Sequence, residues 1–228
     1  MDNSGKIVLD LCGGTGAWSR PYKEAGYNVL VITLPDYDVL NVEFNCDEIT
    51  FISKRNIYAV HNLHIPAGII YGILAAPPCM EFSIAKGNRP RNLPEAMRIV
   101  EACERIIRHC QLYGNLKFWA LENPRGLLRR FLGVPKYTFE QWQFGGNKRK
   151  ATDLWGYFNQ PTPPVKEFPS DIVKNDNRGR AHAADWTIMY CPPEYADYIS
   201  QFKGDAKRAA LRALTLPGFA EAFYKANR

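Results

Sequence analysis

The N-terminal segment constrains the fold more than any other part of the chain. An apolar run at residues 6–11 (KIVLDL) is followed by a glycine-rich turn and by a helix that ends at Gly26. A second apolar run at residues 28–34 (NVLVITL) completes a strand–helix–strand unit. Such a unit favours a parallel sheet with helices packed on it, so the sequence predicts an α/β fold.

Two further predicted strands end in polar turns that contain proline. They are residues 69–75 (IIYGILA), which run into Pro77-Pro78-Cys79, and residues 116–121 (LKFWAL), which run into Glu122-Asn123-Pro124. Between them, residues 94–113 have the apolar spacing of a long helix. Ligands bind beyond the carboxyl ends of the strands in open parallel sheets. We therefore expect the turns at 12–16, 77–83 and 122–125 to meet at one crevice.

The remaining segments are less regular. Two β-rich pieces, residues 49–52 and 57–60, could form a hairpin within the irregular stretch 36–68. Helices are expected from about residue 204 to 214 and from residue 218 to the end.

The turn after the first strand, Asp10-Leu11-Cys12-Gly13-Gly14-Thr15-Gly16, is suited to a nucleotide-like cofactor. Glycines allow a close backbone approach, and the N-terminus of the next helix can meet a polar ligand. A tight structural turn or a dinucleotide-binding protein would give a similar pattern. Against the latter, the spacing is not a full G-x-G-x-x-G, and the second strand ends in Thr33-Leu34-Pro35 without an acidic residue.

Cys79 is a candidate nucleophile, because the prolines before it hold its thiol in a rigid loop at the end of a strand. A thiolate that adds to C6 of cytosine makes C5 nucleophilic enough to attack a sulfonium methyl group. A carboxylic acid near N3 would stabilise that adduct, and Glu122 could supply it. Taken alone, Cys79 could equally be a buried structural thiol and Glu122 a helix cap.

Taken together and in this order, the motifs resemble the DNA cytosine-C5 methyltransferase family, in particular its compact, phage-type members. Asp10 to Gly16 is similar to the family's first motif, Pro77-Pro78-Cys79 with Phe82-Ser83 to its catalytic loop, and Glu122-Asn123 to its catalytic pair. In QFGGNKRK, residues 143–150, Lys148 and Lys150 stand where the family has arginines. RALTLPGFA, residues 212–220, is similar to the closing segment of compact members.

The resemblance implies a Rossmann-like S-adenosylmethionine-dependent methyltransferase sheet with a small, loop-rich recognition region. It implies C5 methylation of a cytosine flipped out of double-stranded DNA, through a covalent Cys79–C6 adduct. The chain would comprise a catalytic cofactor-binding domain (residues 1–155), a target-recognition region (156–205) and C-terminal helices that return to the catalytic domain (206–228).

The resemblance also implies the site residues. The catalytic set is Cys79, Glu122, Lys148 and Lys150. The cofactor set is Asp10, Leu11, Cys12, Gly14, Thr15, Gly16, Trp18, Thr33, Asp38 and Pro77, with Asp38 as the acidic residue near the adenine and Asp36 as the next candidate.

The charge distribution suits a polyanionic partner. The formal net charge is +6, and basic residues are grouped at 86–91, 125–130 and 148–150. A solvated basic face would look the same, since charge steers association without defining a fold. The residues expected to contact DNA are Ser83, Lys86, Arg89, Arg91, Arg125 and Arg149.

Composition limits the other classes. No apolar run approaches the ~20 residues that cross a bilayer and no signal peptide is recognisable, so a cytoplasmic protein is expected. The six cysteines contain no Cys-x-x-Cys pair, and Cys103, His109 and Cys110 lie on a predicted helix, so no metal is expected. The sequence leaves the oligomeric state open.

Three other functions compete with this interpretation. The same chemistry could act on RNA or on a free cytidine nucleotide, because the recognition region is short. A non-catalytic DNA-binding relative is the second alternative. An amino-methyltransferase is the third, but it would need Asp or Asn before Pro-Pro, where this chain has Ala76.

Overall fold

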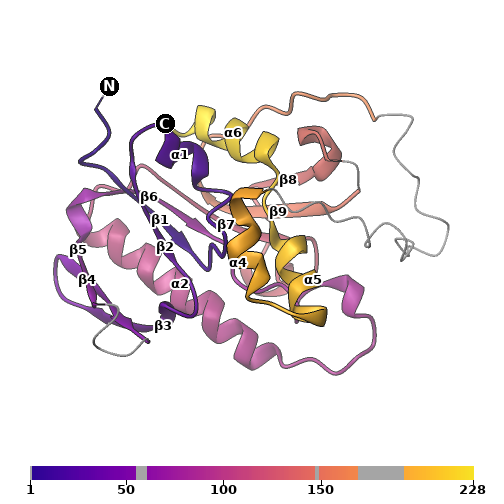
Figure 1. The fold of residues 1–228 in the computed structure, drawn as a ribbon, viewed down its shortest axis with the longest axis horizontal. Coiled ribbons are helices and arrows are strands. Elements are labelled where there is room, and N and C mark those ends of the chain that lie inside the picture. The colour runs from indigo at the N-terminus through magenta and orange to yellow at the C-terminus, as the bar shows by residue number, and fades with distance from the viewer. Residues whose placement is uncertain (1, 55–60, 147–148, 169–192) are drawn as a thin grey trace.

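The computed structural model describes residues 2–54, 61–146, 149–168 and 193–228. In this described part the central sheet has the strand order β2-β1-β6-β7-β9-β8 (Figure 1). Its strands are β1 (Ile7–Leu11), β2 (Asn28–Ile32), β6 (Ile70–Ala75), β7 (Phe118–Pro124), β8 (Tyr137–Glu140) and β9 (Ala151–Tyr157). The pairs β1–β2, β1–β6 and β6–β7 are parallel, while β9 is antiparallel to both of its neighbours. The predicted α/β fold with a Rossmann-like sheet is confirmed.

β1 lies inside the sheet and is buried along its whole length. A strand covered on both faces needs a nearly continuous apolar run, which explains KIVLDL. β7 is longer than the sequence predicted. The expected end at Leu121 is wrong, because Asn123 and Pro124 pair with Asp153 and Thr152 of β9. Glu122 therefore lies inside β7, where it pairs with Leu154 of β9.

A second, antiparallel sheet occupies part of the stretch that the sequence left irregular. Its strands are β3 (Tyr37–Phe44), β4 (Glu48–Ser53) and β5 (Leu63–Pro66), in the order β3-β4-β5. The β-rich piece at residues 49–52 lies in β4, whereas its predicted hairpin partner, 57–60, lies outside the described residues. The observed partners of β4 are β3 and β5.

Helices cover the two faces of the central sheet differently. The α-helices are α1 (Arg20–Glu24), α2 (Leu93–Tyr113), α3 (Arg129–Leu132), α4 (Ala196–Ser200), α5 (Gly204–Ala213) and α6 (Pro217–Ala226). The 3₁₀ turns are η1 (Ala67–Ile69), η2 (Ile84–Lys86), η3 (Gln141–Phe144) and η5 (Pro193–Tyr195). The long α2 packs on the side of β3 and β6, while α1 and α6 lie side by side at the top of Figure 1.

The core beneath α1 and α6 is aromatic. Trp18 lies 5.8 Å from Phe219 and 5.3 Å from Phe223 between ring centroids, and Tyr22 stacks on Phe118 at 5.4 Å. Aromatic pairs at such distances add to the free energy gained from burying apolar area. This cluster ties the last helix of the chain to the first, which brings residues more than 190 positions apart into one core.

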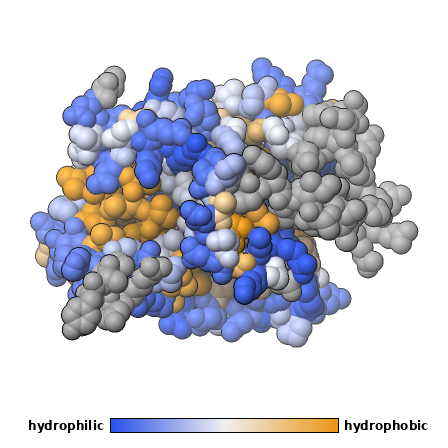
Figure 2. Space-filling model, viewed as in Figure 1, coloured by the Kyte–Doolittle hydropathy of each residue, from blue (hydrophilic) through white to orange (hydrophobic). Residues whose placement is uncertain are grey.

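Figure 2 shows the hydropathy of one face of the molecule. On the face drawn in Figure 2, apolar residues gather on the left and near the centre of an otherwise hydrophilic surface. Within the described residues, no helix is long and apolar enough to cross a membrane.

Candidate active site

The three predicted turns begin side by side at one edge of the sheet. Leu11 at the end of β1 pairs with Ala75 at the end of β6, and Ala75 pairs with Leu121 of β7. The Ala76 N–H donates to the Leu11 carbonyl at 2.9 Å. The first residues beyond β6 are therefore fixed against β1, as the crevice prediction required.

The loop that carries Cys79 is joined to the end of β7 and to the loop that follows it. The side-chain amide of Asn123 donates to the Pro77 carbonyl at 3.0 Å, and the Leu127 N–H donates to the Phe82 carbonyl at 2.9 Å. Gly126 is required at this contact, because a Cβ there would lie 2.3 Å from the Phe82 oxygen. The Cys79 and Glu122 segments are thus held together by their own flanking residues.

Within its loop, Cys79 starts a tight turn. Its carbonyl accepts hydrogen bonds from the Phe82 N–H at 3.1 Å and the Ser83 N–H at 2.9 Å. The Phe82 side chain is fully buried and serves as the apolar anchor of the loop, whereas Met80 is 65% exposed. Cys79 therefore precedes both a solvent-facing residue, Met80, and the buried anchor of the loop, Phe82.

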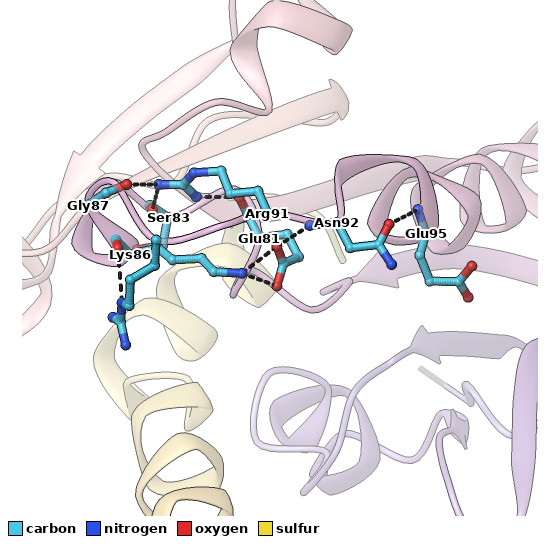
Figure 3. Close-up of polar contacts among 8 residues, drawn as sticks. Glu81, Ser83, Lys86, Gly87, Arg91, Asn92 and Glu95 are labelled. Carbon is cyan, nitrogen blue, oxygen red and sulfur yellow. Dashed lines mark hydrogen bonds and ion pairs between the residues drawn. The ribbon is translucent and has the colours of Figure 1, made fainter.

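Arg91 and Glu81 fasten the rest of the loop (Figure 3). The Arg91 guanidinium donates to the carbonyls of Glu81, Ser83 and Gly87. The Glu81 carboxylate accepts from Lys86 Nζ and, at 2.7 Å, from the Asn92 backbone N–H. A guanidinium can satisfy several carbonyls at once because its donors lie in a fixed plane. The loop is consequently held by side chains that the sequence had pointed toward DNA.

Cys79 and Glu122 influence each other electrostatically. Burial raises the pKa of the Cys79 thiol, the Glu122 charge raises it further, and the charges of Lys150 and Arg212 oppose the rise. Burial likewise raises the pKa of Glu122, against the opposing charge of Lys150 and with help from Asp153. Desolvation disfavours the charged form of each group. The site therefore favours the neutral, protonated form of Glu122. The charge of Lys150 acts on both Cys79 and Glu122.

Lys150 is linked to the C-terminal part of the chain, because its Nζ donates to the Arg212 carbonyl at 3.1 Å. Arg212 and Lys150 together supply the positive charges near Cys79. The sequence predicted Lys150 but did not single out Arg212 for the site, although the motif containing Arg212 had been recognised. Lys148, the other predicted lysine, lies outside the described residues.

The glycine-rich turn adopts a conformation that few residues tolerate. Its φ angles are +56° at Cys12, +57° at Gly14 and +71° at Gly16. Glycine enters this left-handed region without the steric cost that a Cβ brings, so Cys12 is the strained member. At Gly13 a Cβ would lie 2.3 Å from the Asp10 carboxyl carbon. The turn is therefore wrapped closely over Asp10.

Asp10 lies beneath this turn and is completely buried. One oxygen accepts a hydrogen bond from the Ser19 hydroxyl at 2.6 Å, while Oδ1 has no hydrogen-bond partner among the described residues. Burial raises the pKa of Asp10 to about 6, although the Ser19 hydrogen bond opposes the rise. A buried acceptor without a partner has a high desolvation cost.

The other predicted cofactor residues fall into distinct environments. Leu11 and Trp18 are buried in the core, and Pro77 offers its carbonyl to Asn123. Thr15 accepts from the Ala17 N–H at 3.3 Å. Asp38 accepts from the Leu40 N–H at 3.0 Å and pairs with Lys54. Burial would raise the pKa of Asp38, but the Lys54 and Leu40 hydrogen bonds outweigh it and lower the value.

Tyr198 of α4 covers the glycine-rich turn, and no sequence motif pointed to it. A Cβ on Gly14 would lie 3.4 Å from the Tyr198 hydroxyl. Burial raises the pKa of Tyr198, while a hydrogen bond with the side chain of the predicted cofactor residue Thr33 opposes that rise. An ion pair between Arg20 and Glu194 fastens the same segment to α1. The wall of the candidate cofactor site therefore comes partly from the region expected to recognise the target.

The residues expected to contact DNA divide into fastened and exposed members. Lys86 and Arg91 make the loop contacts described above, and the Ser83 hydroxyl accepts from the Ala85 N–H at 3.2 Å. Arg149 lies 4.5 Å from the Phe168 ring centroid and 3.5 Å from the Glu140 carboxylate. Arg89 and Arg125 have exposed side chains, which leaves them accessible to a polyanion, and Arg89 Nε also donates to the Lys86 carbonyl at 3.1 Å.

The cysteines and histidine weighed as metal ligands occupy the core side of α2. Cys103, His109 and Cys110 are all buried there. A hydrogen bond with Cys12 and burial raise the pKa of Cys103, which links α2 to the glycine-rich turn. No group of three or more potential metal ligands occurs in the described part of the chain.

Comparison with known proteins gives one partial likeness. The chain is 30% identical over 123 residues to the Type II methyltransferase M.DdeI of Desulfomicrobium norvegicum. The matched segment makes up 53% of this chain and 28% of that protein. The chain thus matches less than a third of its relative's length. No protein-family model matches the chain.

Proposed function

We propose that the chain is an S-adenosylmethionine-dependent DNA methyltransferase that methylates C5 of cytosine through a covalent bond between Cys79 and C6. The observation that carries the proposal is that Cys79 and Glu122 are held close enough for the charge of one to act on the other. Cys79 follows β6, and Glu122 lies near the end of the neighbouring parallel strand β7. The Asn123–Pro77 hydrogen bond joins their segments, and the Glu122 charge acts on the Cys79 thiol.

Cys79 is the nucleophile in this proposal. Its thiolate forms a bond to C6 of cytosine, and the electron pair of the C5–C6 double bond becomes available at C5. After methylation, loss of the C5 proton restores the double bond and breaks the Cys79–C6 bond, which releases the thiolate. The rigid turn around the Cys79 carbonyl favours this role, because a nucleophile held in place needs less ordering in the transition state.

Glu122 is the acid. A carboxyl with a raised pKa remains protonated at higher pH than an exposed one, so it can donate a hydrogen bond to N3 of cytosine and offset the negative charge that develops there. Loss of the Glu122 charge also removes one of the causes that raise the pKa of Cys79. A proton on Glu122 and a thiolate on Cys79 therefore favour each other.

Lys150 and Arg212 support the ionised thiol. Both charges lower the pKa of Cys79, and the two residues are tied by the hydrogen bond from Lys150 to the Arg212 carbonyl. A lysine keeps the positive charge that the related arginine motif supplies, but it lacks bidentate geometry. We assign Lys150 to electrostatic support of Cys79 and Glu122 rather than to planar recognition of the base.

The glycine-rich turn suits the cofactor. The absence of a side chain at Gly13 lets the turn close over Asp10, and Tyr198, which bonds to Thr33, lies against Gly14 on the other side. Thr15, Gly14 and Gly16 would hold the polar part of the ligand, while Asp10 supports the turn from below. When bound, S-adenosylmethionine supplies the methyl group on a sulfonium centre. The chain's own residues orient that group and exclude water.

Double-stranded DNA is the proposed substrate, supported by the positive net charge and by the exposed side chains of Arg89 and Arg125 near the Cys79 and Glu122 segments. A base within a duplex must leave the stack before a thiol can reach C6. The exposed side chain of Met80, directly after the nucleophile, lies where the opened duplex would contact the loop.

The proposal is tested by incubating the protein with S-adenosylmethionine carrying a tritiated methyl group and, separately, duplex DNA, RNA or dCMP. Digestion to nucleosides then locates the label. We expect 5-methylcytosine from DNA alone. Label on RNA or dCMP would keep the chemistry and change the substrate, label on an exocyclic amine would reject the Cys79 mechanism, and absence of transfer would favour a non-catalytic DNA-binding protein.

A further inference from the structure

The side chain of Tyr198 lies across the crevice at the carboxyl ends of β1 and β2. These parallel strands end side by side, and the Cys12 N–H donates to the Ile32 carbonyl at 2.8 Å. Gly14 follows the first strand closely and Thr33 comes directly after the second. Ligands of open parallel sheets bind at such a place.

The Tyr198 hydroxyl contacts both sides of this crevice. It lies 3.4 Å from the position that a Cβ on Gly14 would take, and it forms a hydrogen bond with the Thr33 side chain. Gly14 has a φ of +57° and no side chain of its own on that side. A ligand that approaches the Gly14 backbone there meets the Tyr198 ring. The place of a ligand is therefore taken by a side chain of the protein itself.

The segment that carries Tyr198 is held by contacts that are easily broken. α4 has five residues, and its closest packing partners are η5 and α5, which are its neighbours in the chain (Figure 1). The ion pair between Arg20 and Glu194 joins the segment to α1, but the two side chains are 45% and 42% exposed. Water screens such a pair, so it adds little stability. Ile199 is buried and anchors α4. A segment attached in this way opens locally more readily than the sheet does.

We propose that Tyr198 is the gate of the cofactor site: its side chain fills the place of the ligand beside Gly14 and turns away when the cofactor enters, which frees Thr33 for the ligand. The gate rests on the proposed function, because it needs the cofactor to bind at this crevice. Only the open form binds, so the closed form lowers the apparent affinity in proportion to its population. The gate acts on association alone, because a bound ligand leaves from the open form.

The test measures binding of S-adenosylhomocysteine to the full chain, with rates from stopped-flow tryptophan fluorescence and the equilibrium constant from calorimetry. This ligand lacks the transferable methyl group, so binding is measured without methyl transfer. Three variants loosen the gate: Tyr198→Ala removes the side chain, Tyr198→Phe removes the hydroxyl, and Arg20→Gln removes the ion pair with Glu194. Tyr157→Phe and Arg98→Gln, at exposed positions of β9 and α2, are the matched controls.

We expect each gate variant to bind faster than the parent without dissociating faster. The association rate should rise about threefold in Tyr198→Phe, as for the loss of one hydrogen bond, and about tenfold in Tyr198→Ala, which also loses the ring. It should rise about twofold in Arg20→Gln, which breaks an exposed ion pair and leaves Tyr198 in place. The controls should keep the rates of the parent, and a thermal melt establishes that every variant is folded.

The rates distinguish the gate from other roles of Tyr198. Faster dissociation at an unchanged association rate in Tyr198→Ala would overturn the proposal, because Tyr198 would then be a wall that contacts the bound ligand. Equal rates in the parent and all variants would reject the gate and keep the cofactor. If none of the folded proteins binds S-adenosylhomocysteine, including Tyr198→Ala, the cofactor assignment fails together with the gate. Binding by Tyr198→Ala but not by the parent would support the gate.

Discussion

The two loops at the edge of the sheet reach a fixed conformation by different means. The glycine-rich turn at residues 12–16 is shaped by left-handed backbone angles over a buried carboxylate, one of whose oxygens has no partner among the described residues. The cysteine loop at residues 77–92 is held by side chains, with Arg91 on three carbonyls and Glu81 on Lys86 and Asn92. The Arg91 guanidinium and the Glu81 carboxylate thus both have hydrogen-bond partners, unlike Oδ1 of Asp10, which has none in the described part of the chain.

The glycine-rich turn should therefore affect mainly the folding free energy, and the cysteine loop mainly the reactivity of Cys79. A turn with a buried, partly unpartnered carboxylate costs folding free energy, which a bound ligand that stabilises the native state can offset. A loop whose polar groups are paired is rigid before substrate arrives, as nucleophilic chemistry requires. Substitutions in the two loops should therefore have opposite signatures, and the predictions below exploit that contrast.

The largest effect is expected for Cys79→Ala, which removes the reacting atom and none of the contacts that hold its loop. Methyl transfer should fall by at least about 10⁴-fold, while the melting temperature and cofactor affinity remain close to those of the parent. Transfer assays and calorimetry measure the two quantities. Cys46→Ala, at an exposed cysteine, is the control that should stay active. Retained turnover in Cys79→Ala would eliminate the covalent mechanism.

The next effect is expected for Glu122→Gln, which should act in opposite directions on two measurements. Methyl transfer should fall by about 10²- to 10⁴-fold, because the acid is lost. At pH values where Glu122 of the parent is ionised, alkylation of Cys79 by iodoacetamide should be faster in the variant, because no Glu122 charge raises the pKa of the thiol. Alkylation is followed by mass spectrometry in a Cys46→Ala background. An unchanged alkylation rate would show that the charge of Glu122 does not affect the Cys79 thiol.

Asp10→Asn should stabilise the cofactor-free protein while weakening cofactor binding. The folded pKa of about 6 against an ordinary value of 3.8 corresponds to about 3 kcal/mol against the ionised form. The parent binds more protons when folded, so its free energy of unfolding should fall as the pH rises from about 4 to about 6.

The substituted asparagine cannot ionise, so that dependence should flatten in the variant, which becomes the more stable protein above about pH 6. Urea unfolding at several pH values measures this effect, with exposed Asp2→Asn as the control. A variant that retains the parent's slope between about pH 4 and about pH 6 would refute the assignment to Asp10.

The smallest effect is expected for Arg91→Lys, which keeps the charge but cannot reach three carbonyls. We expect a loss of about 1–3 kcal/mol in the local stability of the cysteine loop and a fall in kcat of roughly tenfold. Hydrogen exchange of the amides at residues 82–86 reports the loop directly. Arg98→Lys, at a surface pair on α2, should change neither quantity. Equal effects in both variants would mean that Arg91 adds nothing beyond its charge.

The sequence was informative where local pattern determines the outcome. Apolar runs located β1, β2, β6 and α2 within about two residues, and the polar turns after β1 and β6 follow strands that do lie side by side. The extension of β7 was missed because it depends on pairing with the distant strand β9. The three-stranded sheet was missed although its strands follow one another in the chain, because the apolar pattern of residues 36–68 is irregular.

The roles of individual charged residues were harder to predict. Arg91 and Lys86 belong to a basic cluster in the sequence, and only the folded loop reveals that they bind carbonyls and Glu81. Tyr198 was missed for a similar reason, since no motif marks a side chain that reaches Gly14 and Thr33 from a distant segment. The covalent chemistry of Cys79 remains a prediction.

The most direct test of that chemistry is to incubate the protein with S-adenosylmethionine carrying a tritiated methyl group and a duplex containing 5-fluorocytosine, then to run a denaturing gel. Fluorine at C5 cannot leave as a proton does, so a Cys79–C6 bond would be trapped after methylation. We predict a labelled protein–DNA band that is absent with Cys79→Ala and present with Cys46→Ala. Transfer to ordinary duplex DNA without such a trapped band, or a band that survives in Cys79→Ala, would contradict the account.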